Sequence, residues 1–469
     1  MKIAQIMKLL FRLMIIAVLV AALPVYAVPV DLSSAYKKAE EYDAQIRAAH
    51  ADNLIYKQEI EKAKAQFRPN IRLSASRGRD ATQRAYKGQY EPALFYNTIG
   101  NGVSVKQSVL NLANIAEYKQ AKAVVAKSDA ELRKEEVSLI VRITEAYCNA
   151  LYAEDNLNFS ISHTNATLEQ LHQAKSRFEK GFGTITEINE AQASYDMAFA
   201  EGVEVANLVE FNRRELENLI GVYPDELCKL APEKLALTRP EPFSCESWVL
   251  QALSGNPLLI AARQELQIAK REIEIQRAVR YPTIDLVAGK NYSESENNYS
   301  IGYSYDTYSV SIQLSMPMYT GGYTSASIRQ AQAKWLKAVE QLSGQERGVE
   351  SEVRKYYNSV ISSIAQIHAY EQAVKSGEIA FTGTKKGFEV GQRTNVDVLE
   401  AERKLLSSRR DLAKSRYQYI LNHLMLKQSA GTLDQSDIDE VNGWLDVTKK
   451  IIGGITPIHS LSDRLISKS

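Results

Sequence analysis

The side chains best placed to do chemistry are acids that follow two glycine-containing turns. The stretch at about 178–191 carries Thr186, Glu187 and Glu190, and the stretch at about 388–401 carries Phe388, Arg393, Thr394, Asp397 and Glu400. Carboxylates crowded around a narrow passage would favour cations and raise some pKa values by like-charge repulsion. An acid in the first turn of a helix can also simply stabilise that helix end. Both interpretations stay open.

Neither turn has the surroundings of an enzyme site. No His, Ser or Cys constellation accompanies the acids, so no catalytic residue is assigned and we expect no enzyme activity. The histidines are scattered without ligand spacing and are expected to be ordinary surface or core residues: His50, His163, His172, His368, His423 and His459. The phosphate-binding pattern Gly-x-x-x-x-Gly-Lys does not occur, so the sequence shows no nucleotide-binding site that could supply energy for transport. No cofactor or metal is predicted.

The three cysteines point to structure rather than chemistry. Cys148 lies in a helical pattern and is expected to be a small buried apolar residue. Cys228 and Cys245 flank a proline-rich connector at 222–246. In an oxidising compartment they could pair and close a short loop, and their spacing gives no case for zinc.

The two turns belong to an internal duplication. The sequence FEKGFGTITEINEA at 178–191 aligns with FEVGQRTNVDVLEA at 388–401, an offset of 210 residues (388 − 178). The same offset pairs Tyr147 with Tyr357 and Gly221 with Gly431. Each copy has the pattern of a helix, a turn with Gly and Thr, and a second helix opened by an acid. The repeated unit is therefore predicted to be a helical hairpin, and its turn is the best candidate for the functional region.

Helical periodicity fills most of the chain. We expect helices from Asp31 to Gln66 and from Ser247 to Val279, each ended by a proline. Long helical tracts follow, from Ile115 to Lys180 and from Tyr323 to Val390, with return helices from Thr186 to Ile220 and from Val396 to Ala430. Apolar residues recur at three and four in the second tract, which predicts coiled-coil-like packing: Val349, Val353, Tyr356, Val360, Ile364, Ile367 and Val374. Its glycines argue against an unbroken helix: Gly344, Gly348, Gly377, Gly383 and Gly387.

Period-two alternation predicts one β-hairpin in each half, at about 68–110 and 281–318. The clearest case alternates Tyr308, Val310, Ile312 and Leu314 with Ser309, Ser311, Gln313 and Ser315. Tyrosines crowd these segments, as they do at membrane interfaces: Tyr86, Tyr90, Tyr96, Tyr292, Tyr299, Tyr303, Tyr305, Tyr308 and Tyr319. A soluble hairpin with one wet face fits the strands equally well. Four strands are too few to close a barrel, so a membrane sheet would require several chains, and three would supply twelve strands.

The N-terminus carries a targeting signal. Lys2, Lys8 and Arg12 precede an apolar run from Leu13 to Leu23, with small residues suited to cleavage after Ala27. The run is too short to span a bilayer, so residues 1–27 are predicted to be a signal peptide. With 57 Lys and Arg against 56 Asp and Glu, the chain is nearly neutral and a nucleic-acid partner is not expected.

The predicted organisation is one body built of two similar halves. It comprises the signal peptide at 1–27, a first repeat at 28–221, the connector at 222–246, a second repeat at 247–433 and a tail at 434–469. The end of the tail, from Ile452 to Ser469, is expected to be disordered.

Three segments carry a family resemblance over nearly the whole mature chain. VGQRTNVDVLEA at 390–401, LSMPMYTGG at 314–322 and LNHLMLKQSAGTL at 421–433 resemble signature segments of the TolC family of outer-membrane efflux and secretion channels. The resemblance implies a mainly α protein with a membrane β-barrel portion, in which three chains share a twelve-stranded barrel that continues as an α-helical tunnel across the periplasm. It also implies a closed tip that opens when a periplasmic adaptor and an inner-membrane transporter of ABC or RND type dock.

The resemblance also implies roles for the turn residues. Asp397 and Glu400 would line the constriction, and Arg393 and Thr394 would hold it shut with Thr186 and Glu187. Gly181, Thr184 and Gly391 would form the adaptor-docking tip. Phe388 stands where the family often has Tyr, and Phe cannot donate that hydrogen bond, so the latch would rest more on Arg393. The alternative is a soluble periplasmic coiled-coil scaffold, and the sequence does not distinguish a protein cargo from a drug.

Overall fold

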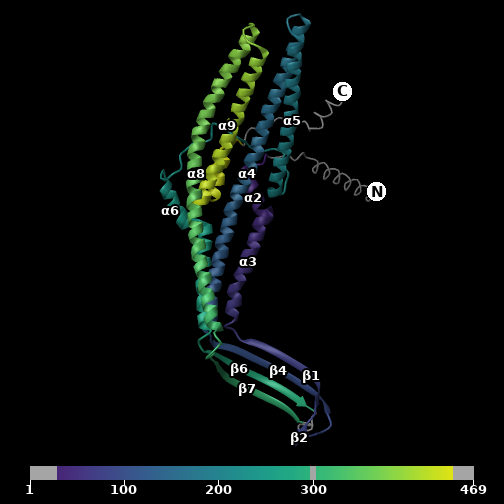
Figure 1. The fold of residues 1–469 in the computed structure, drawn as a ribbon, viewed down its shortest axis with the longest axis vertical. Helices are drawn as coiled ribbons and strands as arrows, with labels where there is room; N and C mark the ends of the chain where they lie inside the picture. The colour runs from purple at the N-terminus through teal and green to yellow at the C-terminus, as the bar shows by residue number, and fades with distance from the viewer. Residues whose placement is uncertain (1–28, 296–302, 447–469) are drawn as a thin grey trace, which may run out of the picture.

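The computed structural model describes residues 29–295 and 303–446. The predicted signal peptide, Tyr299 and the predicted disordered end lie outside the described residues. The described chain is elongated, with a β-sheet at one end, helical turns at the other and a bundle of long helices between them (Figure 1).

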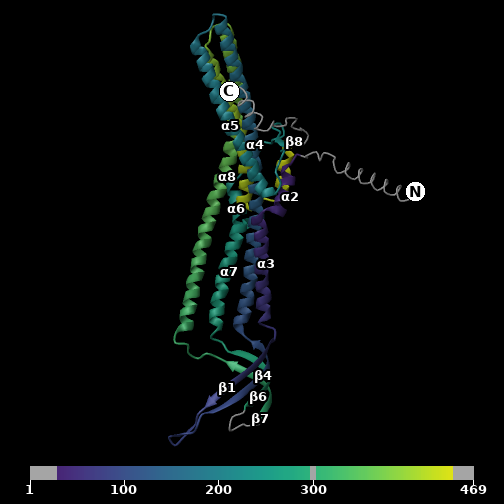
Figure 2. The same cartoon turned by 90° about the vertical axis from the view of Figure 1, so that its right-hand side faces the viewer.

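Two helical hairpins form the body, as the duplication predicts. The first pairs α4 (Leu112–Glu179) with α5 (Ile185–Ile220), and the second pairs α8 (Tyr323–Glu389) with α9 (Asn395–Ala430). Gly221 and Gly431 end the return helices with φ of 74° and 75°, a left-handed conformation that glycine adopts without strain. Both turns lie at the end of the molecule away from the sheet (Figures 1 and 2).

The predicted apolar stripe of α8 is confirmed. Val349, Val353, Val360 and Ile367 are at most 2% exposed, and they share one core with α4 and α9. Tyr356, Ile364 and Val374 pack against that core as partly buried neighbours. The expected interruption of α8 at its glycines is wrong, because one helix runs through all five, and packing along this stripe outweighs their weak propensity. No helix in the described ranges carries an apolar stretch long enough to cross a membrane.

The helix before each strand pair is broken, which corrects the prediction of single helices. The first half has α2 (Leu32–Tyr42) and α3 (Ala44–Ala65), and the second has α6 (Cys245–Gly255) and α7 (Pro257–Ala278). At the first break the Asp43 carboxylate accepts from the Ile46 N–H at 3.3 Å. At the second the Asn256 side chain accepts from the Leu258 N–H at 2.9 Å, with Pro257 opening α7. Both breaks are therefore N-caps that start a new helix.

The strands form one sheet rather than two separate hairpins. β1 (Asn70–Thr82), β4 (Leu94–Leu110), β6 (Thr283–Ser295) and β7 (Tyr303–Ser315) are antiparallel in the order β1-β4-β6-β7. The β4–β6 pairing joins the two halves of the duplication. A small ribbon, β2 (Ala85–Tyr86) with β3 (Gln89–Tyr90), lies between β1 and β4 in the chain.

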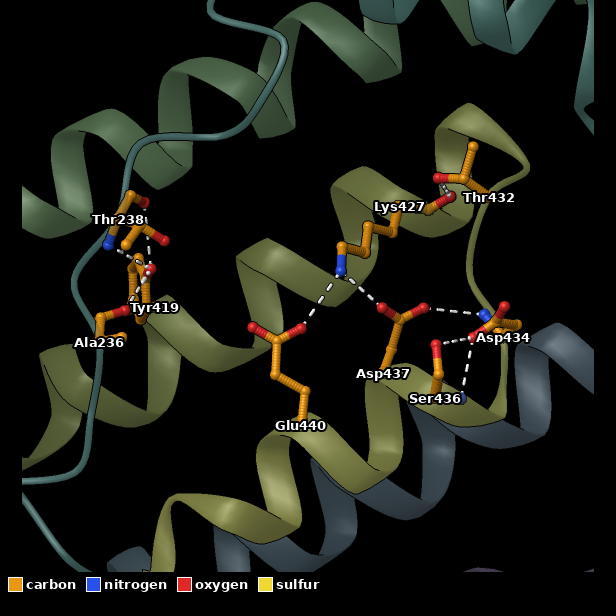
Figure 3. Close-up of polar contacts among 9 residues, drawn as sticks. All are labelled: Ala236, Thr238, Tyr419, Lys427, Thr432, Asp434, Ser436, Asp437 and Glu440. Carbon is orange, nitrogen blue, oxygen red and sulfur yellow. Dashed lines mark hydrogen bonds and ion pairs between the residues drawn. The ribbon is translucent and has the colours of Figure 1, made fainter.

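The connector and the described part of the tail dock against the middle of the helices. β5 (Lys229–Leu230) pairs with β8 (Leu445–Asp446), and α10 (Gln435–Gly443) lies beside α9 (Figure 3). The Lys427 Nζ lies 2.5 Å from Asp437 Oδ1 and 3.4 Å from Glu440 Oε2. The Tyr419 hydroxyl donates to the Ala236 carbonyl at 3.0 Å and accepts from the Thr238 N–H at 3.1 Å (Figure 3). Helix α9 therefore anchors both segments.

The predicted disulfide is not present in the structure, where all three cysteines are free. Cys228 is 2% exposed and its Sγ lies 3.9 Å from the Pro29 carbonyl oxygen, whereas Cys245 is the first residue of α6. Burial raises the pKa of Cys228 to about 11, so its thiol stays protonated at neutral pH. Cys148 is 3% exposed, which confirms it as a small buried apolar residue.

Candidate channel gate and membrane sheet

The first tip is a tight turn between α4 and α5. Gly181 has a φ of 79°, and its N–H donates to the Phe178 carbonyl at 2.9 Å. Thr184 is the N-cap of α5, and its hydroxyl accepts from the Glu187 N–H at 3.2 Å. Thr186 and Glu190 are exposed. The tip thus offers two acids, and Glu187 occupies the first turn of α5.

The second tip repeats this geometry, and its helix N-terminus is capped by two hydrogen bonds instead of one. The Thr394 hydroxyl accepts from the Asp397 N–H at 3.2 Å, and the Asp397 carboxylate accepts from the Thr394 N–H at 2.8 Å. This reciprocal capping box fixes the start of α9. The hydrogen bond from the Thr394 backbone, with the Thr394 side chain and the nearby Arg393 charge, holds the pKa of Asp397 below its usual range. Asp397 is therefore ionised at neutral pH, and Glu400 is exposed one turn further on.

Arg393 folds against its own hairpin. A Cβ on Gly387 would lie 2.9 Å from the Arg393 Cγ, so the arginine stem occupies the space that a side chain at 387 would need. Within one chain, over the described residues, Arg393 is not hydrogen-bonded to Thr186 or Glu187. The latch through those residues stays a prediction for the assembled channel.

The contact between the two tips uses a residue that the sequence did not single out. The guanidinium of Arg177 lies over the Phe388 ring, with its Cζ 4.9 Å from the ring centroid. The duplication contained a signal for it, since Arg177 and Gly183 in the first copy align with Gly387 and Arg393 in the second. The arginine and the glycine of this pair of positions therefore exchange places between the two copies.

Polar links also join the hairpins below the tips. The buried Glu402 of α9 accepts from Gln170 Nε2 of α4 at 3.0 Å, and His163 Nδ1 lies 3.4 Å from its other oxygen. Arg410 of α9 pairs with Glu201 of α5 at 2.7 Å. The first hairpin is thus linked to α9 at two positions along that helix, Glu402 and Arg410.

In the part nearest the helices, the sheet has one apolar and one polar face. Direct pairs in an antiparallel sheet point to the same side, so the register shows which side chains share a face. One row across all four strands is Ile71, Val105, Ala288 and Val310, and the next row, on the opposite face, is Arg72, Ser104, Gly289 and Ser309. Residues along β7 continue the apolar face, where Val310 and Ile312 are 77% and 74% exposed.

Such a sheet suits a wall between lipid and water. Its apolar face would contact hydrocarbon, and its serine- and glycine-rich face would line an aqueous passage. Strands β1 and β7 each pair on one side only in the described chain. The fold and the sheet together define a channel-forming protein of the outer membrane that projects long helical hairpins.

The chain belongs to the outer membrane efflux protein family, whose model matches residues 35–222 and 248–432. It is 34% identical to the alkaline protease secretion protein AprF of Pseudomonas aeruginosa, over 88% of this chain and 87% of AprF. It is 30% identical to the outer membrane protein TolC of Vibrio cholerae, over 90% of this chain and 95% of that protein. The fold also matches the crystal structure of the outer membrane protein VceC from Vibrio cholerae, with a TM-score of 0.73, 21% identity, and coverage of 85% of this chain and 96% of VceC.

The family assignment confirms the resemblance and the predicted localisation. The protein is an outer-membrane export channel of the efflux and secretion class, with its helical part in the periplasm. The alternative of a soluble periplasmic scaffold is not supported.

Proposed function

We propose that three copies of this chain form one conduit, which is gated at the tips 178–191 and 388–401. The conduit is the exit duct of a tripartite efflux pump or a type I secretion system. A periplasmic adaptor docks at the tip around Gly181, Thr184 and Gly391, and an inner-membrane ABC or RND-type transporter supplies the energy.

The observation that carries the proposal is the sheet, which has two faces and two open edges. A single four-stranded sheet cannot enclose a passage, and unpaired strand edges are unfavourable in a bilayer. Pairing β7 of one chain with β1 of the next removes every edge and gives twelve strands. The relatives support an export role, because two of them are named as secretion proteins for proteases.

The gate assignment rests on charge at the second tip. Asp397 is ionised and held by the Thr394 cap, and Glu400 is exposed beside it. Three copies of this pair around one axis would make a ring of six carboxylates that attracts cations. Glu187 and Glu190 would add to the ring from the first tip.

Planar-bilayer recordings of the purified protein test the gate. Asp397→Ala with Glu400→Ala should reduce cation selectivity and block by trivalent cations. Asp397→Asn with Glu400→Gln should do the same while an amide oxygen preserves the bond to the Thr394 N–H, which separates the loss of charge from the loss of the cap. Glu233→Ala, at an exposed acid of the connector, is the matched control and should leave selectivity unchanged. Unchanged selectivity in both double variants would reject the assignment.

A further inference from the structure

We propose that Arg177 is a positioning residue of the gate, which holds the two tips of one chain together through the face of the Phe388 ring and thereby favours the closed channel. This inference rests on the proposed gate and adds to it a contact that is not a hydrogen bond. The guanidinium carbon lies 4.9 Å from the centroid of the ring, within the range of a cation–π interaction.

The contact lies where it has the greatest mechanical effect. Arg177 is in the last turn of α4 and Phe388 is in the last turn of α8, the two longest helices of the chain. Both helices lead from the sheet end to the tip end of the molecule (Figure 1). A link at their far ends opposes the outward movement of one hairpin relative to the other.

The other links described between the hairpins reach a different helix. Glu402 and Arg410 connect the first hairpin to α9, and both lie further from the turn. The Arg177–Phe388 contact reaches α8 itself. It therefore adds a direct link from the first hairpin to α8, which is also joined to α9 by the Arg409–Glu378 and Arg416–Glu371 ion pairs.

The residue types at the exchanged positions fit this arrangement. Gly387 leaves room for the stem of Arg393, whose Cγ would lie 2.9 Å from a Cβ at that position. Gly183 lies against the Phe178 N–H, where a Cβ would approach to 2.9 Å, so the first tip has no second arginine to compete with Arg177. The ring of Phe388 needs no hydroxyl to accept a cation on its face.

The size of the effect follows from the exposure of the contact. A cation–π contact at a partly exposed site changes an equilibrium by about two- to fivefold. The effect multiplies when three chains open together. Removing either partner should therefore raise the ratio of open to closed channels measurably.

Single-channel recordings of the purified full-length trimer test the latch. Arg177→Gln and Phe388→Leu should each raise the ratio of open to closed channels by about two- to fivefold for each chain, or about 8- to 125-fold when three chains open together. The double variant should raise it no further. Arg177→Lys retains a cation and should behave like the wild type. Phe388→Tyr retains the ring and adds a donor hydroxyl, so it should open no more often than the wild type. Lys175→Gln removes a nearby exposed charge of α4 and should also have no effect.

The outcomes separate the latch from the gate. If the wild type forms channels and Arg177→Gln opens no more often, or if the two single effects multiply in the double variant, the latch is wrong while the channel stands. If the wild type forms no channel, the proposed function fails instead. Spin labels at Lys180→Cys and Glu389→Cys in a Cys245→Ser background then measure the tip separation directly. The latch predicts a wider separation in Arg177→Gln, and an unchanged separation would overturn it.

Discussion

Tyr147 and Tyr357 lie one repeat apart, and both donate a hydrogen bond to a backbone carbonyl of the connector. The Tyr147 hydroxyl lies 2.9 Å from the Val30 carbonyl oxygen and 3.0 Å from that of Cys228. The Tyr357 hydroxyl donates to the Phe243 carbonyl. The duplicated tyrosine thus fixes the non-duplicated connector at both of its ends.

This relationship predicts unequal effects of two matched substitutions. Tyr147 is 1% exposed, so Tyr147→Phe removes a buried donor to the Cys228 carbonyl and should cost about 1–3 kcal/mol of stability. The Val30 carbonyl still accepts from the Cys228 N–H at 3.3 Å. Tyr357→Phe removes a more exposed bond and should cost less, about 0.5–1.5 kcal/mol. Thermal unfolding of the two variants in detergent measures the difference, and equal midpoints would contradict the structural role of Tyr147.

Acid should loosen the docking of α10 through His423. Its ring is buried beside Tyr419 and Trp444, and neither ring nitrogen has a hydrogen-bond partner in the described chain. Burial, reinforced by the Lys427 charge, lowers the pKa of His423 below its usual 6.5. The His423 ring therefore binds a proton more readily when α10 is undocked than when α10 is docked. Docking is strongest above pH 6.5 and weakens as pH falls towards the lowered pKa, by about 1.4 kcal/mol for each unit of difference.

Hydrogen exchange of α10 between pH 7 and pH 5 measures this weakening. The carboxylates facing the ring, Asp437 and Glu440, are both paired with Lys427. His423→Phe removes the titrating group and should make the protection of α10 independent of pH in this range. A pH dependence that persists in this variant would assign the effect to another group.

The two faces of the sheet predict different effects of one added charge on the yield of membrane protein. Ile312→Arg places a cation on the apolar face and should cost about 2–4 kcal/mol in the bilayer, which lowers the yield of outer-membrane protein. Gln313→Arg is the matched control, because residue 313 points to the polar face. Its yield should match that of the wild type. Equal yields of the two variants would contradict the assignment of the faces.

Gly387 predicts a defect at the gate. A methyl group at this position would lie 2.9 Å from the Arg393 Cγ, so Gly387→Ala should displace the Arg393 side chain. The helix itself should become slightly more stable, since Ala exceeds Gly in helix propensity by about 1 kcal/mol. Gly383→Ala has open space around it and is the control. Higher conductance in Gly387→Ala alone is expected, and the same conductance in both variants would show that Arg393 does not help to close the tip.

The sequence predicted the elements well because the duplication and the periodicities are local signals. The stripe from Val349 to Val374 and the caps at Gly221 and Gly431 needed no knowledge of distant contacts. The breaks at Asp43 and Asn256 were missed, although each residue is a suitable N-cap and Pro257 marks the second break.

Contacts between the halves could not be predicted in the same way. The β4–β6 pairing and the contact of Arg177 with Phe388 join residues about two hundred positions apart, and no local pattern specifies such partners. The position of Asp397 fits either a helix cap or a channel constriction, and the structure of one chain shows the cap. The ring of acids is a proposal for the assembled channel.

The mass of the purified mature protein in detergent, measured together with its conductance in a planar bilayer, tests whether three chains form one channel. Three chains that share one sheet should give a particle with three times the mass of the processed polypeptide, and that particle should conduct ions. A stable monomer that does not insert into lipid would contradict the account.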